Sequence, residues 1–193
     1  MVHLGAPQVF VSLLFFVVQA IILRAFSGTR FRLLCSLSVF VPVAFGNLFF
    51  ILSDSESATL LFLISTTVFL AYATFFLLKD VFTTNLVDTS TLLNAVSAYL
   101  LIAIIAAMVH GLIAFFIPNS YNFMEVADTR SDIYELMYFS VVTLTTLGYG
   151  DYLPLSEVAK SFVAIEALVG QIYIAVIIAR LVSLHDTKPQ GEP

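Results

Sequence analysis

The chain has 193 residues, of which 60% are hydrophobic and 11% are charged, and its formal net charge is -5. Soluble domains carry about 25% charged residues, so this composition excludes a soluble globular protein. The one cysteine, Cys35, excludes an intrachain disulfide and is expected to be an inert buried thiol.

Long apolar segments dominate the sequence. A helix of about 20 apolar residues crosses the hydrocarbon core of a bilayer, which predicts an all-α membrane protein. The N-terminus lacks the basic region of a cleaved signal peptide, so the first segment is expected to remain in the mature protein. The expected spans are Val9–Leu23, Phe31–Leu52, Ala58–Leu78, Thr91–Ile117 and Ser156–Leu184. A shorter apolar piece, Ile133–Thr145, cannot cross the bilayer and predicts a re-entrant helix.

The basic residues indicate how these spans are oriented. If five spans alternate, six basic residues fall on one side of the membrane: Arg24, Arg30, Arg32, Lys79, Arg180 and Lys188. The other side holds only Arg130 and Lys160. Positive residues mark the cytoplasmic side, so we expect the N-terminus outside and the C-terminus inside. The expected location is the plasma membrane, which is the inner membrane if the source is bacterial.

Acidic residues concentrate near the predicted outer face. They are Asp54, Glu56, Glu125, Asp128, Asp132, Asp151 and Glu157. They could form a solvated, negatively charged loop surface. Alternatively, a ring of carboxylates contributed by several chains could raise the cation concentration at a pore mouth, which requires oligomerisation.

The stretch "TTLGYGD", residues 145–151, is an irregular backbone between apolar segments. Such backbone is tolerated at membrane depth only where it is buried in protein or lines water. Gly148 and Gly150 can adopt positive φ, which allows successive carbonyls to point the same way. A column of carbonyls can replace the hydration shell of a monovalent cation. Thr146 would add a hydroxyl at the inner end, and Tyr149 would pack behind the column.

From Thr91 to Leu184 the sequence resembles the pore domain of tetrameric potassium channels, with outer helix, pore helix, T-x-G-Y-G-D filter and inner helix. The resemblance implies a homotetramer in membrane lipid that conducts K⁺, and we expect no nucleic-acid partner. The implied filter residues are Thr146, Leu147, Gly148, Tyr149 and Gly150, with K⁺ at the first four and Asp151 just outside.

Four positions depart from patterns found in the family. Leu147 stands where Val or Ile is typical, which leaves the degree of selectivity open. Tyr138 and Phe139 replace the two tryptophans of many members. The Tyr138 hydroxyl could form a hydrogen bond with Asp151, whereas Phe139 has no polar group that could bond Tyr149. We therefore expect the side chains that surround the filter, here called the filter cuff, to form fewer hydrogen bonds than in those members. Val142 occupies the place where some bacterial channels carry a glutamate.

The last apolar segment is expected to be the inner helix. Gly170 is either a gating hinge, by family resemblance, or a point of close helix packing. From Gln171, helical spacing reaches Ile174, Ile178 and Val182. These residues could line the cavity and gate it by dewetting, or they could face lipid or other helices.

Glu166 is an ionisable residue within the same predicted span, which makes it a candidate functional residue. It could accept hydrogen bonds from pore-helix hydroxyls such as those of Thr143 or Thr145, be protonated, or act as a structural brace. Three histidines, His3, His110 and His185, could each sense pH, but an isolated histidine is more often incidental.

The resulting organisation has four parts. Residues 1–78 form a three-helix membrane module, 79–90 a cytoplasmic linker that could lie as a short interfacial helix, 91–184 the pore domain, and 185–193 a short cytoplasmic tail. The first three spans lack interior arginines, which argues against a voltage sensor of the arginine type.

The leading hypothesis is a potassium-selective channel. The alternatives are a weakly selective cation channel and a non-conducting regulatory subunit. An enzyme is not expected, because no metal-ligand cluster, nucleophile–base pair or phosphate loop appears.

Overall fold

Helices account for most of the described chain. The computed structural model describes residues 30–53, 55–84, 88–123 and 133–186, with side chains from residue 40 to residue 183 within those ranges. The helices are α2 (Arg30–Leu52), α3 (Glu56–Thr83), α4 (Thr89–Phe116), α5 (Ile133–Leu144) and α6 (Glu157–Asp186).

Each described helix coincides with an apolar segment expected from the sequence, within a few residues except at the end of α3. The first expected span, Val9–Leu23, lies outside the described residues. Three helices are long and apolar enough to cross a membrane, namely Glu56–Thr83, Thr89–Phe116 and Glu157–Ser183. The shorter α5 is not, in agreement with the re-entrant segment that its length predicts.

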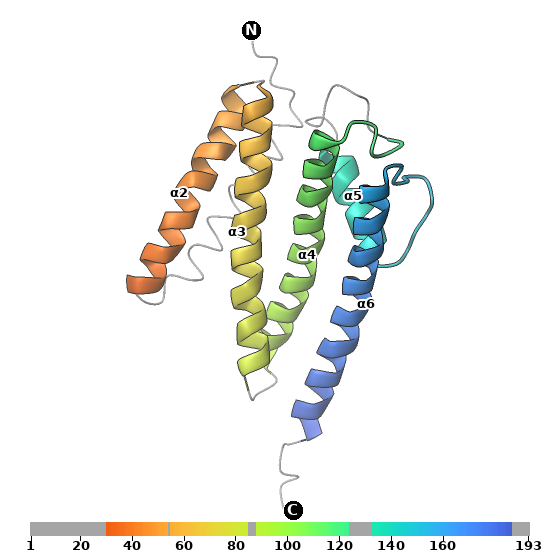
Figure 1. Ribbon diagram of the computed structural model, residues 1–193. Helices are drawn as coiled ribbons and strands as arrows, with labels where there is room; N and C mark the ends of the chain where they lie inside the picture. The colour runs from red at the N-terminus through yellow and green to blue at the C-terminus, as the bar shows by residue number, and fades with distance from the viewer. Residues whose placement is uncertain (1–29, 54, 85–87, 124–132, 187–193) are drawn as a thin grey trace, which may run out of the picture.

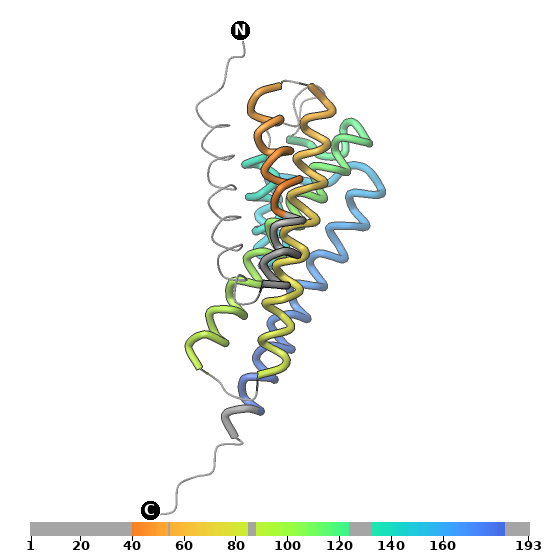
Figure 2. The backbone as a smooth tube through the Cα atoms, turned by 90° about the vertical axis from the view of Figure 1, so that its left-hand side faces the viewer, coloured from red at the N-terminus to blue at the C-terminus, as the bar shows by residue number. Residues whose placement is uncertain are grey.

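The long helices α2, α3, α4 and α6 lie side by side, and α5 is confined to one half of their length (Figure 1). Figure 2 shows the same bundle from the side, with the lower part of α6 continuing well past α5. Apart from the helices, the described residues contain one isolated antiparallel bridge, between Tyr121 and Pro154. This bridge lies next to the "TTLGYGD" stretch.

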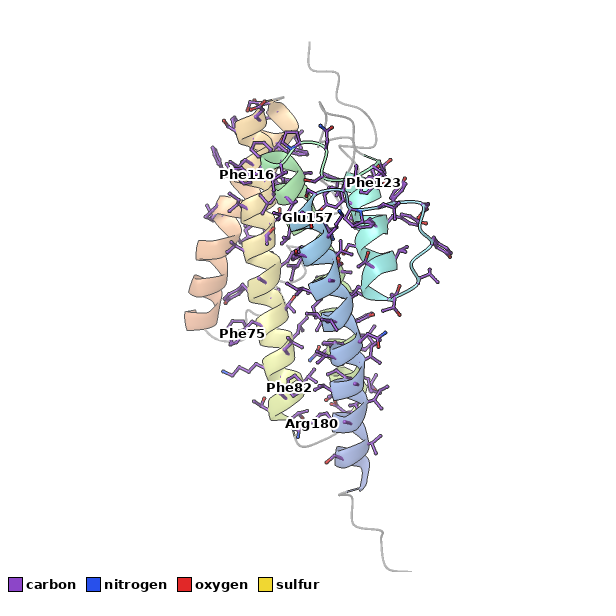
Figure 3. All side chains as sticks on the ribbon, turned by 45° about the vertical axis from the view of Figure 1, so that its right-hand side comes forward. Phe75, Phe82, Phe116, Phe123, Glu157 and Arg180 are labelled. Atoms are coloured by element: carbon purple, nitrogen blue, oxygen red, sulfur yellow. The ribbon has the colours of Figure 1, made fainter. Side chains whose placement is uncertain are left out.

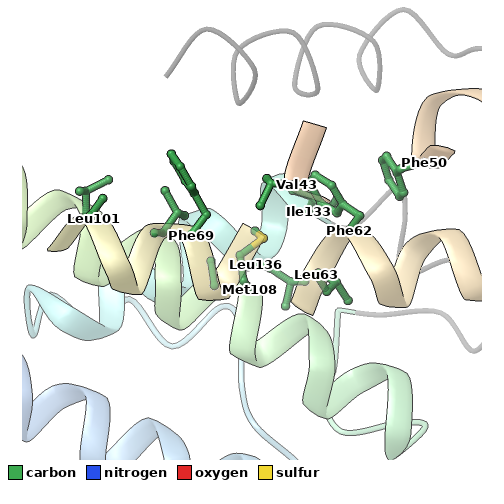
Figure 4. Packing of buried hydrophobic residues seen from close by; sticks show 12 residues of the cluster. Val43, Phe50, Phe62, Leu63, Phe69, Leu101, Met108, Ile133 and Leu136 are labelled. Atoms are coloured by element: carbon green, nitrogen blue, oxygen red, sulfur yellow. The ribbon is translucent and has the colours of Figure 1, made fainter. Parts of the chain in front are cut away.

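The largest apolar cluster among the described residues connects the front helices α2 and α3 with α4 and α5 (Figure 4). Val43 and Phe50 of α2 pack with Phe62 and its neighbours on α3, and the rings of Phe50 and Phe62 stack at 4.5 Å. The same cluster contains Met108 of α4 and Leu136 of α5. Because α5 contributes to this core, the front helices directly support the short helix that precedes the filter stretch.

The short interfacial helix expected over residues 79–90 is not found among the described residues of that linker. Helix α3 instead continues to Thr83, and α4 begins at Thr89 after its N-cap, Asp88. The Asp88 carboxylate accepts hydrogen bonds from the backbone N–H and the hydroxyl of Thr91, at 2.8 and 2.7 Å. This capping satisfies orphan donors of the first turn and fixes where α4 starts.

The end of α3 is attached to the lower part of α6. The Arg180 guanidinium donates to the carbonyls of Phe82 and Thr84, at 3.0 and 2.8 Å, and Figure 3 shows Arg180 beside Phe82. Next to this contact, Val81 is fully buried against Ile177. The last carbonyls of a helix lack intrahelical partners and carry partial negative charge, so a cation suits this position.

We expect Arg180→Ala to loosen the junction between α3 and α6. The substitution removes two charge-assisted hydrogen bonds, worth about 1 kcal/mol together at a partly exposed site. Amide hydrogen exchange in the last turn of α3 should therefore become faster. Lys160→Ala is the control, because it removes only an exposed pair with Glu157. Equal exchange in both variants would contradict a stabilising role for Arg180.

Candidate functional site

The filter stretch begins where α5 ends, and its backbone amides satisfy the carbonyls of that helix. The N–H groups of Leu147 and Gly148 both donate to the carbonyl of Val142, at 3.0 and 3.3 Å. The N–H of Thr146 donates to the carbonyl of Thr143, at 2.9 Å. The peptide bonds are trans, so the N–H and C=O of each peptide unit point in opposite directions. The carbonyls of residues 145, 146 and 147 therefore point away from α5.

The backbone of the stretch alternates in handedness. Thr146, Gly148 and Gly150 have positive φ, of 59°, 57° and 79°. Leu147 and Tyr149 between them do not. The two glycines predict this alternation. It also includes Thr146, whose positive φ could not be predicted because the residue is not a glycine. A non-glycine residue at positive φ is uncommon and marks a constrained position.

The outer end of the stretch is held by the loop after α4. The side-chain amide of Asn122 donates to the carbonyl of Asp151 at 3.1 Å and accepts from the N–H of Leu153 at 2.7 Å. The carbonyl of Ser120 accepts from the N–H of Leu155 at 2.7 Å. These bonds fix the segment after the filter against the loop. Sequence reasoning missed Asn122, because no local pattern connects it with a segment about 30 residues away.

The hydrogen bond predicted between Tyr138 and Asp151 is present, at 2.8 Å. It holds the pKa of Asp151 below its usual value and raises the pKa of Tyr138 to about 12. Asp151 is therefore a carboxylate and Tyr138 a neutral donor at neutral pH. The ring of Tyr138 stacks on that of Tyr149, with centroids 6.4 Å apart and planes 7° apart. Tyr149 thus packs against α5, and its role behind a column of carbonyls stays a prediction.

Phe139 does not contact Tyr149 among the described interactions. It lies instead in a buried aromatic group with His110, Tyr121 and Phe123. Val142 contributes its carbonyl to the filter amides, while its side chain is buried. These observations explain how the cuff can hold its shape without tryptophan.

At Gly170, α6 packs closely against the C-terminal end of α5. A Cβ added there would lie 2.1 Å from the Leu144 carbonyl oxygen, which is far inside van der Waals contact. The Tyr99 hydroxyl donates to the same carbonyl at 3.2 Å. The close-packing interpretation of Gly170 is therefore confirmed, and the hinge stays a prediction.

The residues expected to line the cavity lie on α6 below this contact. Gln171 reaches the Thr146 hydroxyl through a long hydrogen bond of 3.4 Å. Ile174, Ile178 and Val182 are exposed in the single chain. They therefore form a face that other chains or lipid can cover, which leaves the cavity role a prediction.

Glu166 is buried, and its partners differ from those expected. Its carboxyl oxygens contact Ser140 of α5 and His110 of α4, at 2.5 and 2.8 Å, rather than Thr143 or Thr145. The His110 ring is completely buried and its other nitrogen contacts the Tyr121 hydroxyl at 2.6 Å. His110 is therefore not an isolated histidine, contrary to expectation. His3 and His185 lie where the structure describes no side chain.

Comparison with known proteins bears on this geometry. The pattern that describes the family "Ion channel" matches residues 98–185, which include about two thirds of α4, all of α5, the "TTLGYGD" stretch and nearly all of α6. The two pore potassium channel c of Oryza sativa subsp. japonica is 34% identical over 62 residues. That match covers 32% of this chain and 14% of the rice protein, so the chain matches only a small part of its relative. No solved structure matches the chain.

The resemblance to the potassium-channel pore family is confirmed. The matched residues contain α5, the "TTLGYGD" stretch and most of α6 in the order expected from the sequence. Assembly, ion selectivity and the role of each filter residue are taken up as proposals below.

We expect Tyr138→Phe to weaken the outer end of this potassium-channel-like filter. The variant keeps the ring that stacks on Tyr149 and removes only the hydroxyl bonded to Asp151. Current through reconstituted channels should then inactivate faster, because the segment after the filter loses one of its two side-chain anchors. Tyr134→Phe, a hydroxyl removed from the same helix, is the control. Unchanged conduction and inactivation in Tyr138→Phe would show that this bond does not support the filter.

We expect Gly170→Ala to destabilise the chain although alanine favours helix by about 1 kcal/mol. The new methyl group collides with backbone at Leu144, and overpacking of this kind costs about 1–3 kcal/mol. Gly111→Ala is the matched control, because its Cβ would meet the movable side chain of Leu63 at 3.0 Å. Thermal unfolding in detergent should give a lower midpoint for Gly170→Ala than for Gly111→Ala. The reverse order would be inconsistent with backbone contact at Gly170.

Proposed function

We propose that this protein is a potassium-selective ion channel that conducts K⁺ passively through a filter of backbone carbonyls. The alternating positive φ at Thr146, Gly148 and Gly150 is the observation that carries the proposal. Alternation allows consecutive carbonyls to face one axis, where they can replace the water around a dehydrated K⁺ ion. The ion is the transported substrate, bound at Thr146, Leu147, Gly148 and Tyr149.

The amide contacts with α5 support the direction of that carbonyl column. Because Leu147 and Gly148 donate their N–H groups toward Val142, the carbonyls of Thr146 and Leu147 are free to face the ion. The C-terminal end of α5, with its partial negative charge, lies directly behind the inner end of the column. Both features favour a cation over an anion.

The proposed assembly is a homotetramer in membrane lipid. One filter strand encloses nothing, and closed cyclic symmetry brings identical strands around one axis. Leu147 and Tyr149 are 56% and 65% exposed in the single chain, and the outward face of α6 is exposed as well. These surfaces are apolar and continuous with the filter, so neighbouring copies are suitable partners for them. The acidic residues near the filter would then surround its mouth.

Gating by a voltage sensor of the arginine type is not part of the proposal. Along α3, Lys79 near its end is the one basic residue, and α2 carries arginines only at its start. Positive residues at one end of the bundle favour a cytoplasmic C-terminus and an outward-facing filter in the plasma membrane.

A weakly selective cation channel is the second candidate, favoured by Leu147 and by a cuff in which one phenol, Tyr138, bonds Asp151. A γ-branched side chain at Leu147 fits behind a filter less tightly than Val or Ile. A non-conducting regulatory subunit is the third candidate.

Reconstitution of the purified full chain in liposomes separates these candidates. With a K⁺ gradient, we expect a barium-blocked K⁺ flux that exceeds the Na⁺ flux. Gly148→Ala should abolish flux while the oligomer persists, since alanine is strained at a φ of 57°. Equal K⁺ and Na⁺ fluxes would favour the weakly selective channel. No flux from an intact tetramer would favour the regulatory subunit, and either result would contradict the proposal.

A further inference from the structure

Four buried polar side chains join three helices and a loop behind the filter. His110 of α4, Tyr121 of the following loop, Ser140 of α5 and Glu166 of α6 are each at most 3% exposed. The contacts run in one continuous row. Tyr121 Oη lies 2.6 Å from His110 Nδ1, and His110 Nε2 lies 2.8 Å from Glu166 Oε2. Glu166 Oε1 then contacts Ser140 Oγ, which lies 2.7 Å from the carbonyl of Ala103.

The number of protons in this row determines the state of Glu166. The Ser140 hydroxyl has one proton but two neighbours, the carbonyl of Ala103 and the carboxyl of Glu166. A carbonyl can only accept, and an ionised carboxylate can only accept. Unless Ser140 shares its one proton between both acceptors, each contact is a full two-centre hydrogen bond only if Glu166 carries a proton on Oε1 and donates it to Ser140, which donates its own proton to Ala103.

The other half of the row fits the same state. Glu166 Oε2 accepts from the Nε2–H of a neutral His110, and Nδ1 accepts from the Tyr121 hydroxyl. Each side-chain polar atom along the row then has a partner of the complementary kind. An imidazolium at His110 would instead donate from both nitrogens, which would leave the Tyr121 proton without a hydrogen-bond acceptor among the described residues.

The surroundings disfavour an ionised carboxylate. The His110 ring packs edge-on against Phe139 of α5 and Phe162 of α6. Among the described residues, no lysine, arginine or aspartate forms an ion pair or hydrogen bond with this row. An ionised Glu166 beside a neutral His110 would therefore be a buried charge without a counter-ion, which costs several kcal/mol.

We propose that Glu166 is protonated in the folded channel and acts as a positioning residue for the filter. Its donated hydrogen bond ties α6 to Ser140, four residues before Leu144, where α5 ends and the filter begins. His110 ties the same carboxyl to α4. The neutral row thus fixes the pore helix between the outer and inner helices. The positioning role rests on the proposed function, whereas the protonation of Glu166 does not.

Infrared spectroscopy of the full chain in lipid vesicles tests the protonation directly. At neutral pH, the spectrum of the wild type minus that of Glu166→Gln should contain the C=O band of a protonated carboxyl group, shifted in D₂O. Glu157→Gln is the control. Glu157 is an exposed side chain paired with Lys160, so its substitution should remove only carboxylate bands from the spectrum. A carboxylate band alone in the Glu166 difference spectrum would overturn the proposal, whatever the channel conducts.

Conservative rescue tests the positioning role. A glutamine can donate from its amide nitrogen to Ser140 and accept from His110, whereas Glu166→Ala leaves both partners unsatisfied. We expect the K⁺/Na⁺ flux ratio of Glu166→Ala to fall below that of Glu166→Gln, because alanine removes the partner of both Ser140 and His110 and so loosens the helix that precedes the filter. If the alanine variant does not assemble, the thermal midpoints of the two variants replace the fluxes in this comparison. Equal values for glutamine and alanine would contradict the positioning role.

Discussion

The carbonyl of Val142 is the acceptor on which the geometry of the filter stretch depends. It accepts hydrogen bonds from the N–H groups of both Leu147 and Gly148. The chain that leaves α5 therefore folds back against the last turn of that helix. Backbone that is not helical must find hydrogen-bond partners in protein or water at membrane depth, and here the carbonyl of α5 is one such partner. Once these amides face the helix, the carbonyls of the same peptide units must face the opposite direction. The orientation of the column therefore follows from how the helix ends.

The features that could be predicted from the sequence are those with a local cause. Apolar runs predicted the extent of the described helices, except at the end of α3, because a membrane-spanning helix must match the thickness of the bilayer. The two glycines predicted the alternating backbone, since positive φ is easiest for glycine. Tyr138 and Asp151 were paired correctly because both lie next to the filter. Thr146 escaped prediction, since its positive φ is imposed by the hydrogen bonds on either side of it.

The features that could not be predicted depend on the register between distant helices. Glu166 was expected to meet a threonine near the end of the pore helix, yet it meets Ser140, one turn earlier. A shift of a few ångströms along α6 exchanges one partner for the other, and no sequence pattern encodes that offset. His110 likewise looked isolated because its partners, Tyr121 and Glu166, come from other segments. Helix α3 continues to Thr83, past the end expected for its span, for a related reason. Arg180 binds the extra turn of α3 from a helix about 100 residues away.

The contact between Gly170 and the Leu144 carbonyl has a mechanical consequence. Helix α6 extends about 20 Å from this contact to Glu157 and about 24 Å from it to Asp186, at 1.5 Å per residue. If α6 tilted as a rigid rod about this contact, its two ends would move in opposite directions. The end at Asp186 would move about 1.2 times as far as the end at Glu157, because its arm is longer in that ratio.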